Sequence, residues 1–119
     1  MEDVAMPDSV PGFDEMPLYD VPAPPPSIRQ AANHRRLQTR FLRAGREAVD
    51  DRELLELLLA GRREVDDAGA LAGCLLDTFG TAPRTLAARP DRLRRLPGLS
   101  EDAIAALKAA EALGIRMAR

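Results

Sequence analysis

Residues 93–107 read LRRLPGLSEDAIAAL, and this stretch decides the fold. Gly98 separates two segments of helical spacing, where it tolerates a positive φ and allows two backbones to approach closely. Ser100, which precedes Glu101 and Asp102, is suited to cap the second helix. Apolar side chains at four positions can pin the two helices together: Leu96, Leu99, Ile104 and Leu107. The stretch predicts a short helix, a tight turn and a second helix that begins at Ser100.

A leucine-rich segment, LLELLL, lies upstream at residues 54–59. Asp50 and Glu53 have the spacing of a capping box in front of it, which predicts a helix from about residue 51 to residue 60. Five leucines in six positions cover nearly the whole circumference of such a helix. We therefore expect a central helix that has neighbours on several sides.

Three further segments have helical spacing: residues 28–43, residues 67–79 and residues 100–113. Asp66 or Asp67 is placed to cap the second of these helices. Cys74, the only cysteine, lies within that helix and is expected to be a small buried residue. Pro83 and Pro90 mark short helical turns before the last helix.

The composition agrees with an all-α fold. Hydrophobic residues make up 45% of the chain and are mostly Leu and Ala, while aromatic residues make up only 3%, which suits packed helices better than sheets. We predict one compact bundle of about five short helices over residues 28–119, with the two-helix unit at about residues 91–113. Because no apolar run approaches the ~18 residues of a membrane span and no signal peptide is visible, we expect a soluble, cytoplasmic protein without a membrane partner.

The first 27 residues differ from the rest. They include VPAPPP at residues 21–26, which favours extended polyproline II, so we expect a disordered arm over residues 1–27. All six charged residues of this arm are acidic, whereas residues 28–119 hold all 17 Lys and Arg against 13 acidic residues, a net charge of +4. An acidic arm next to a basic domain is consistent with a domain that binds a polyanion, in which case the arm competes with the polyanion for the basic surface. It is equally consistent with an arm that only keeps the protein soluble.

The stretch at residues 93–107 resembles a helix-hairpin-helix motif. The resemblance implies that backbone N–H groups of the turn bind a phosphate of a nucleic-acid backbone, those of Gly98, Leu99 and Ser100. Positive charge would come from three side chains: Arg94, Arg95 and Lys108. This chain has Ser100 where the motif usually has a second glycine, and Glu101 and Asp102 repel a phosphate. Because turns of this shape also serve as plain helix connectors, both interpretations stay open.

A second resemblance covers most of the chain. It is carried by HRRL (34–37), FLRAG (41–45), EAVDDRELLELLL (47–59), the helix and Phe-Gly ending at 71–80, and residues 93–107. In order and spacing these segments resemble the N-terminal helical domain of RadC-type (UPF0758) proteins. In that family the domain precedes a JAB/MPN-type domain with His-x-His and Asp metal ligands, and the traditional label is DNA repair. His34 is the only histidine here, so a zinc site of that type cannot be built from this chain.

These patterns predict a non-enzymatic module that binds the DNA sugar-phosphate backbone through the helix-hairpin-helix, with DNA repair as the context that the family implies. One alternative is a protein-interaction or scaffold module, and another is the regulatory half of a truncated RadC-like JAB/MPN metalloprotein, with a separate JAB/MPN domain as its partner. No nucleophile and base pair, nucleotide-binding loop or metal-ligand set is visible in the sequence, so we expect no catalytic residue, no metal and no cofactor.

Arginines recur through the first predicted helix and leave two interpretations open. The series could face phosphates or could be an ordinary solvated helix face: Arg29, Arg35, Arg36, Arg40 and Arg43. His34 lies among them and is expected to be solvated.

Overall fold

The computed structural model describes residues 26–119, and among these residues it contains helices but no strand. There are six α-helices and one short 3-10 helix, η3: α1 (Pro26–Ala44), η3 (Arg46–Ala48), α2 (Asp51–Leu59), α3 (Ala68–Phe79), α4 (Ala82–Ala87), α5 (Pro90–Leu93) and α6 (Glu101–Met117). The predicted all-α fold is therefore confirmed. The expected arm at residues 1–27 lies outside the described residues, apart from its last two positions, which begin α1.

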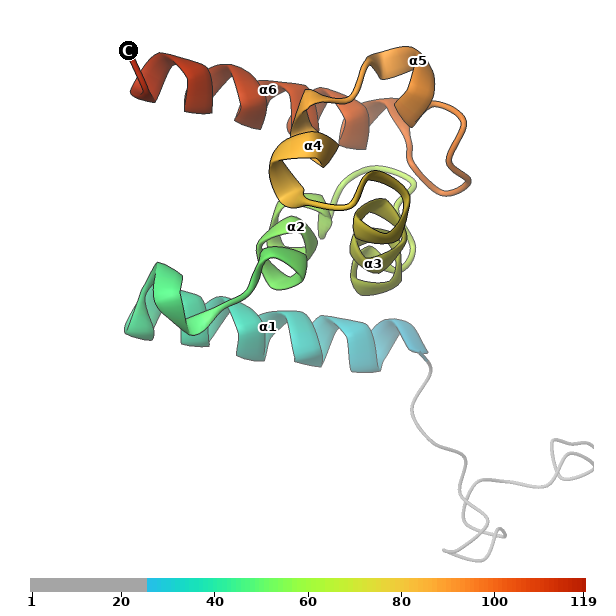
Figure 1. Cartoon of the computed structure of the whole chain (residues 1–119). Coiled ribbons are helices and arrows are strands. Elements are labelled where there is room, and N and C mark those ends of the chain that lie inside the picture. The colour runs from blue at the N-terminus through green and yellow to red at the C-terminus, as the bar shows by residue number, and fades with distance from the viewer. Residues whose placement is uncertain (1–25) are drawn as a thin grey trace, which may run out of the picture.

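The helices are stacked in layers, with α1 and α6 as the outer helices (Figure 1). Between them, α2 and α3 lie side by side, and α4 contacts both of them as well as α6. Helix α2 contacts α1, α3, α4 and α6, which confirms the central position expected from its leucines. The turn between α5 and α6 lies at the N-terminal end of α6, at one edge of the stack (Figure 1).

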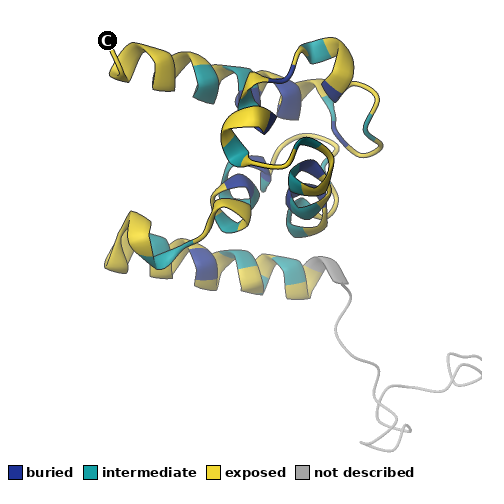
Figure 2. Cartoon of the chain, viewed as in Figure 1, coloured by how far each residue is buried: buried dark blue, intermediate teal, exposed yellow. Residues whose placement is uncertain are grey.

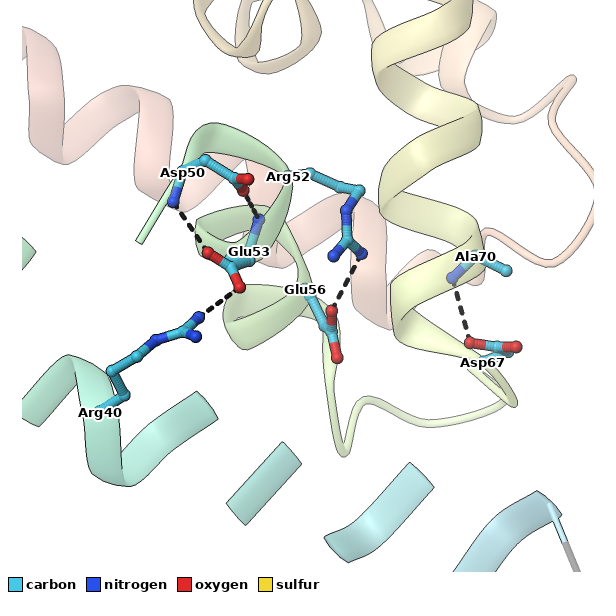
Figure 3. Close-up of polar contacts among 7 residues, drawn as sticks. All are labelled: Arg40, Asp50, Arg52, Glu53, Glu56, Asp67 and Ala70. Carbon is cyan, nitrogen blue, oxygen red and sulfur yellow. Dashed lines mark hydrogen bonds and ion pairs between the residues drawn. The ribbon is translucent and has the colours of Figure 1, made fainter. Parts of the chain in front are cut away.

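Side chains at the helix starts fix the helix boundaries. The Asp50 carboxylate accepts the Glu53 N–H at 2.8 Å, and the Glu53 carboxylate accepts the Asp50 N–H at 3.0 Å, so the predicted capping box is present (Figure 3). Asp67, rather than Asp66, caps α3 by accepting the Ala70 N–H at 3.0 Å. These bonds satisfy donors that the first turn of a helix leaves without a partner.

The core lies where α2, α3, α5 and α6 meet, as Figure 2 shows for the buried positions. Its largest fully buried apolar side chains come from four different helices: Leu59, Leu75, Leu93 and Leu107. Leu99 and Ile104 are also buried and Leu96 packs against the cluster, so the four apolar positions predicted to pin the last two helices do so. Thr85 is the buried polar side chain of this core, and its hydroxyl donates to the Thr81 carbonyl at 2.8 Å.

Two predictions about single side chains were wrong. Cys74 is exposed, because the buried face of α3 is set by Leu71, Ala72 and Leu75 and Cys74 lies off that face. His34 is half-buried rather than solvated, because it lies on the side of α1 that also carries the buried Leu37.

Helix α6 extends further than expected, to Met117 instead of about residue 113. Its last turns leave the bundle (Figure 1), and Leu113, Ile115 and Met117 are exposed. Neither α6 nor any other helix within residues 26–119 is both long and apolar enough to cross a membrane.

Truncation of Leu107 should test the core. Leu107 is fully buried on α6, so Leu107→Ala should lower the free energy of unfolding by about 2–5 kcal/mol in urea titrations. The matched control is Leu113→Ala on the same helix, where the side chain is 61% exposed and the change should stay within about 0.5 kcal/mol. Equal losses in the two variants would contradict this assignment of the core.

Candidate nucleic-acid interface

The turn between α5 and α6, residues 94–100, has the tight geometry that the sequence predicts. Gly98 adopts φ +83°, and a Cβ built there would meet no atom within 4 Å, so this point of the turn faces open space. Leu99 is 7% exposed and points into the core. Ser100 caps α6, since its hydroxyl oxygen accepts the Ala103 N–H at 3.2 Å. The turn therefore exposes Gly98 and the start of α6 while Leu99 anchors it.

Arg94 spans this turn and binds two carboxylates. Its guanidinium donates to the two Glu101 oxygens at 2.8 and 3.2 Å, and to Asp91 at 3.1 Å. The hydrogen bond from Arg94 lowers the pKa of Glu101, and the same pair raises the pKa of Arg94. The negative charge of Glu101, one of two acidic residues in the first turn of α6, is thus partly offset by an arginine that the sequence suggests as a phosphate ligand.

Asp102 also has a partner within the protein. Its carboxylate accepts the backbone N–H of Arg63 at 2.9 Å, which ties the start of α6 to the loop between α2 and α3. The sequence gave no signal for this contact, because the two residues are 39 positions apart. Asp102 is therefore a link between layers as well as an acidic residue at a helix start.

Lys108 lies about two helical turns further along α6 and contacts α4 rather than the turn. Its ammonium donates to the carbonyl oxygens of Leu86 at 2.9 Å and Ala88 at 3.0 Å, and it pairs with Glu111 at 2.6 Å. A rise of 1.5 Å per residue puts it about 12 Å along the axis from Ser100. The structure therefore does not bring Lys108 to the turn, but uses it to hold the end of α4 against α6.

Arg95 is the predicted cation that stays exposed next to the turn, and it makes no ion pair with another residue of the described chain. Nearby, the Arg92 guanidinium lies 5.1 Å from the centre of the Phe79 ring, a cation–π contact between α5 and α3. Of the six predicted residues, five are thus together at the turn: Arg94, Arg95, Gly98, Leu99 and Ser100.

A large hollow lies elsewhere, between α1 and the α2–α3 region; none of the six residues predicted for the turn lines it, whereas His34, Arg36 and Arg40 of α1 do. Its charges are mostly paired with one another: Arg40 with Glu53, and Arg52 with Glu56 at 3.2 Å (Figure 3). Hydrogen bonds from the Asp50 backbone and from Arg40 lower the pKa of Glu53. No group of three or more His, Cys, Asp or Glu side chains within residues 26–119 is placed to hold a metal ion.

Two similar proteins identify the family of the chain. It is 45% identical over 83 residues to a UPF0758 protein of Rhodobacter capsulatus, a match that covers 70% of this chain and 39% of that relative. It is 44% identical over 87 residues to a UPF0758 protein of Ruegeria pomeroyi, with 73% and 39% covered. The chain belongs to the UPF0758 family. The family resemblance inferred from the sequence is therefore confirmed.

This UPF0758 chain spans about two fifths (39%) of the length of the curated relatives that it matches. No family model and no solved structure matches it. The relatives thus establish the family, while the role of the turn has to be argued from its geometry.

Replacement of Lys108 should reveal its structural task. Lys108→Met keeps the aliphatic stem but leaves the Leu86 and Ala88 carbonyls without their donor, which should lower the free energy of unfolding by about 1–2 kcal/mol. Arg95→Met, at an exposed site, should be nearly neutral in the same urea titration. A stable Lys108→Met protein would show that the two carbonyls do not depend on this ammonium.

The Arg94–Glu101 pair predicts a dependence of stability on pH. A carboxyl whose pKa is lower in the folded state contributes stability above its unfolded pKa, and this contribution is lost as the pH falls through the folded pKa. Urea titrations from about pH 6 down to about pH 3 should therefore show Glu101→Gln losing less stability than the wild type. Asp77→Asn, at an exposed site outside the turn, should follow the wild type, and identical profiles for all three proteins would contradict the prediction.

Proposed function

We propose that this UPF0758 segment is a non-enzymatic DNA-binding module that acts in the cytoplasm and holds the sugar-phosphate backbone at the α5–α6 turn, in the manner of a helix-hairpin-helix. The observation that carries the proposal is the open start of α6. Gly98 leaves it uncovered, and the acidic side chains beside it are turned to partners in the protein. The family label implies DNA repair as the setting.

Two acidic residues at the start of α6, Glu101 and Asp102, oppose phosphate binding at the turn by charge repulsion. Glu101 now lies against the Arg94 guanidinium, and Asp102 accepts the Arg63 N–H, so both negative charges are partly offset. The N–H groups in the first turn of a helix and the positive end of its dipole favour an anion once that repulsion is reduced. Contacts of this kind recognise the backbone and read no base, so we propose binding without strong sequence preference.

The positive charge at the turn is modest. Residues 90–102 hold three arginines and three acidic residues, so their net charge is zero. Arg95 and the outer edge of the Arg94 guanidinium are the groups available to a phosphate, while Lys108 supports the turn from a distance by fixing α4. The proposed contact is therefore a positioning contact rather than the main source of electrostatic attraction.

A protein-interaction role is the second candidate, and the end of α6 favours it. Leu113, Ile115 and Met117 are 61%, 51% and 85% exposed on turns that project from the bundle. Exposed apolar side chains in a group are typical of a surface for a protein partner, such as a separate JAB/MPN domain. This alternative predicts no salt-sensitive affinity for DNA.

An isosteric pair of variants at Gly98 tests the turn. Asn and Asp both tolerate left-handed backbone better than other residues, so Gly98→Asn and Gly98→Asp should strain the turn equally. Only Gly98→Asp adds a negative charge where the phosphate would lie, and it should weaken duplex DNA binding about tenfold relative to Gly98→Asn in fluorescence anisotropy at low salt.

Circular dichroism should first show that both variants keep the helical content of the wild type. Equal affinity of the two variants would argue against a phosphate at the turn. A wild-type protein that binds no single-stranded, duplex or branched DNA at low salt would overturn the proposed function and favour the protein-interaction role.

A further inference from the structure

Helix α1 is long, but it contributes few buried side chains to the core. It covers 19 residues, yet Leu37, 7% exposed, is its one buried side chain among those described, and Ile28 and Leu42 are 58% and 76% exposed. Its main neighbours among the described elements are η3 and α2, and α1 lies on the outside of the bundle (Figure 1). Packing by itself thus gives little reason for a helix of this length.

The exposed surface of α1 is strongly basic. The helix carries five arginines and no acidic residue. Four of these side chains line an open, shallow hollow together with Thr39: Arg35, Arg36, Arg40 and Arg43. We refer to Arg29 and these four as the arginine face, and all five are exposed.

The arginine face differs from the other charged surfaces of the described chain. Helices α2, α5 and α6 each carry acidic as well as basic residues, and three of their basic residues form ion pairs: Arg52 with Glu56, Arg94 with Glu101 and Lys108 with Glu111. On α1, Arg40 alone forms an ion pair with a described residue, to Glu53 of α2. A helix face that is merely solvated usually mixes both signs, since like charges three and four positions apart destabilise the helix. A helix with five arginines, no acidic residue and one ion pair to another described residue therefore points to a polyanionic ligand.

The position of the apolar side chains on α1 favours nucleic acid rather than a membrane surface as the polyanionic ligand. A helix that lies on a bilayer buries an apolar face in the lipid. On α1 the apolar face, with Leu37 and Phe41, is turned towards the protein, and the exposed Ile28 and Leu42 are 14 positions apart, about 21 Å along the axis. What α1 offers outward is guanidinium groups, which bind phosphate oxygens in a bidentate manner.

We propose that the arginine face of α1 is a second binding surface for the nucleic-acid backbone, separate from the α5–α6 turn. This proposal rests on the proposed function only in the ligand, which is nucleic acid in both cases. The contact residues differ, so an experiment can reject the arginine face and keep the turn, or the reverse. Arg35 and Arg43 are eight positions apart, about 12 Å along the helix, and can therefore contact different phosphates. Because α2 and α3 lie between α1 and α6, changes at the two surfaces should add in free energy.

The experiment compares two double variants of equal charge in the full chain. Arg35→Gln with Arg43→Gln removes two charges from the arginine face, and neither residue pairs with a described acid or is buried. Arg116→Gln with Arg119→Gln removes two charges from the exposed end of α6 and serves as the control. Anisotropy of a labelled DNA duplex is measured between about 50 and 200 mM salt, where each phosphate contact contributes about −0.9 to the slope of log K against log salt.

The α1 variant should reduce the magnitude of this slope by about 1.8, so that the wild-type affinity falls about 12-fold more than that of the variant over the same range. The control should keep the wild-type slope. Equal slopes for the wild type and the α1 variant, or equal changes in both double variants, would overturn the proposal.

Two further measurements separate this proposal from the proposed function. If Gly98→Asp weakens binding and the α1 variant does not, the turn binds DNA and the arginine face does not; the reverse pattern retains the arginine face and rejects the turn. Sedimentation with vesicles of anionic phospholipid tests the membrane alternative, and binding to vesicles without binding to the duplex would overturn the proposal.

Discussion

Burial of the leucine helix α2 is the interaction on which the other elements depend. Leu59 is completely buried, and α2 contacts both outer helices as well as α3 and α4. The start of α2 is fixed by Glu53, whose carboxylate closes the capping box with Asp50 and also binds Arg40 of α1. One carboxylate therefore sets both where the central helix begins and how α1 lies on it.

Charged residues in the bundle are divided between fold and surface. Lys108 satisfies two carbonyls at the end of α4, Asp102 holds the α2–α3 loop, and Arg94 spans the turn. Each contact joins segments that are separated along the chain, and each engages the charged group with a partner inside the protein. A charge beside a candidate motif is therefore weak evidence for a ligand until its partner in the fold is known. Arg35 and Arg43 differ, because they have no such partner among residues 26–119.

The sequence predicted what depends on neighbouring residues. The capping box at Asp50, the cap at Ser100 and the positive φ of Gly98 follow from side chains within a few positions, and helical periodicity predicted most of the core. It could not predict contacts between distant positions, such as Asp102 with Arg63, because spacing along the chain carries no signal for them. Cys74 shows the same limit, since a helix with apolar residues on several sides leaves open which side its neighbours cover.

The two candidate surfaces differ in the kind of energy that they can supply. Residues 90–102 have no net charge, so a phosphate at the turn gains directional hydrogen bonds but releases few counterions. Helix α1 has a charge of +5, with one arginine held in an ion pair, and its long side chains impose little direction. Attraction at a distance would therefore come from α1, and a defined position on the backbone from the turn. Because α2 and α3 lie between α1 and α6, the two surfaces would contact different stretches of the nucleic-acid backbone.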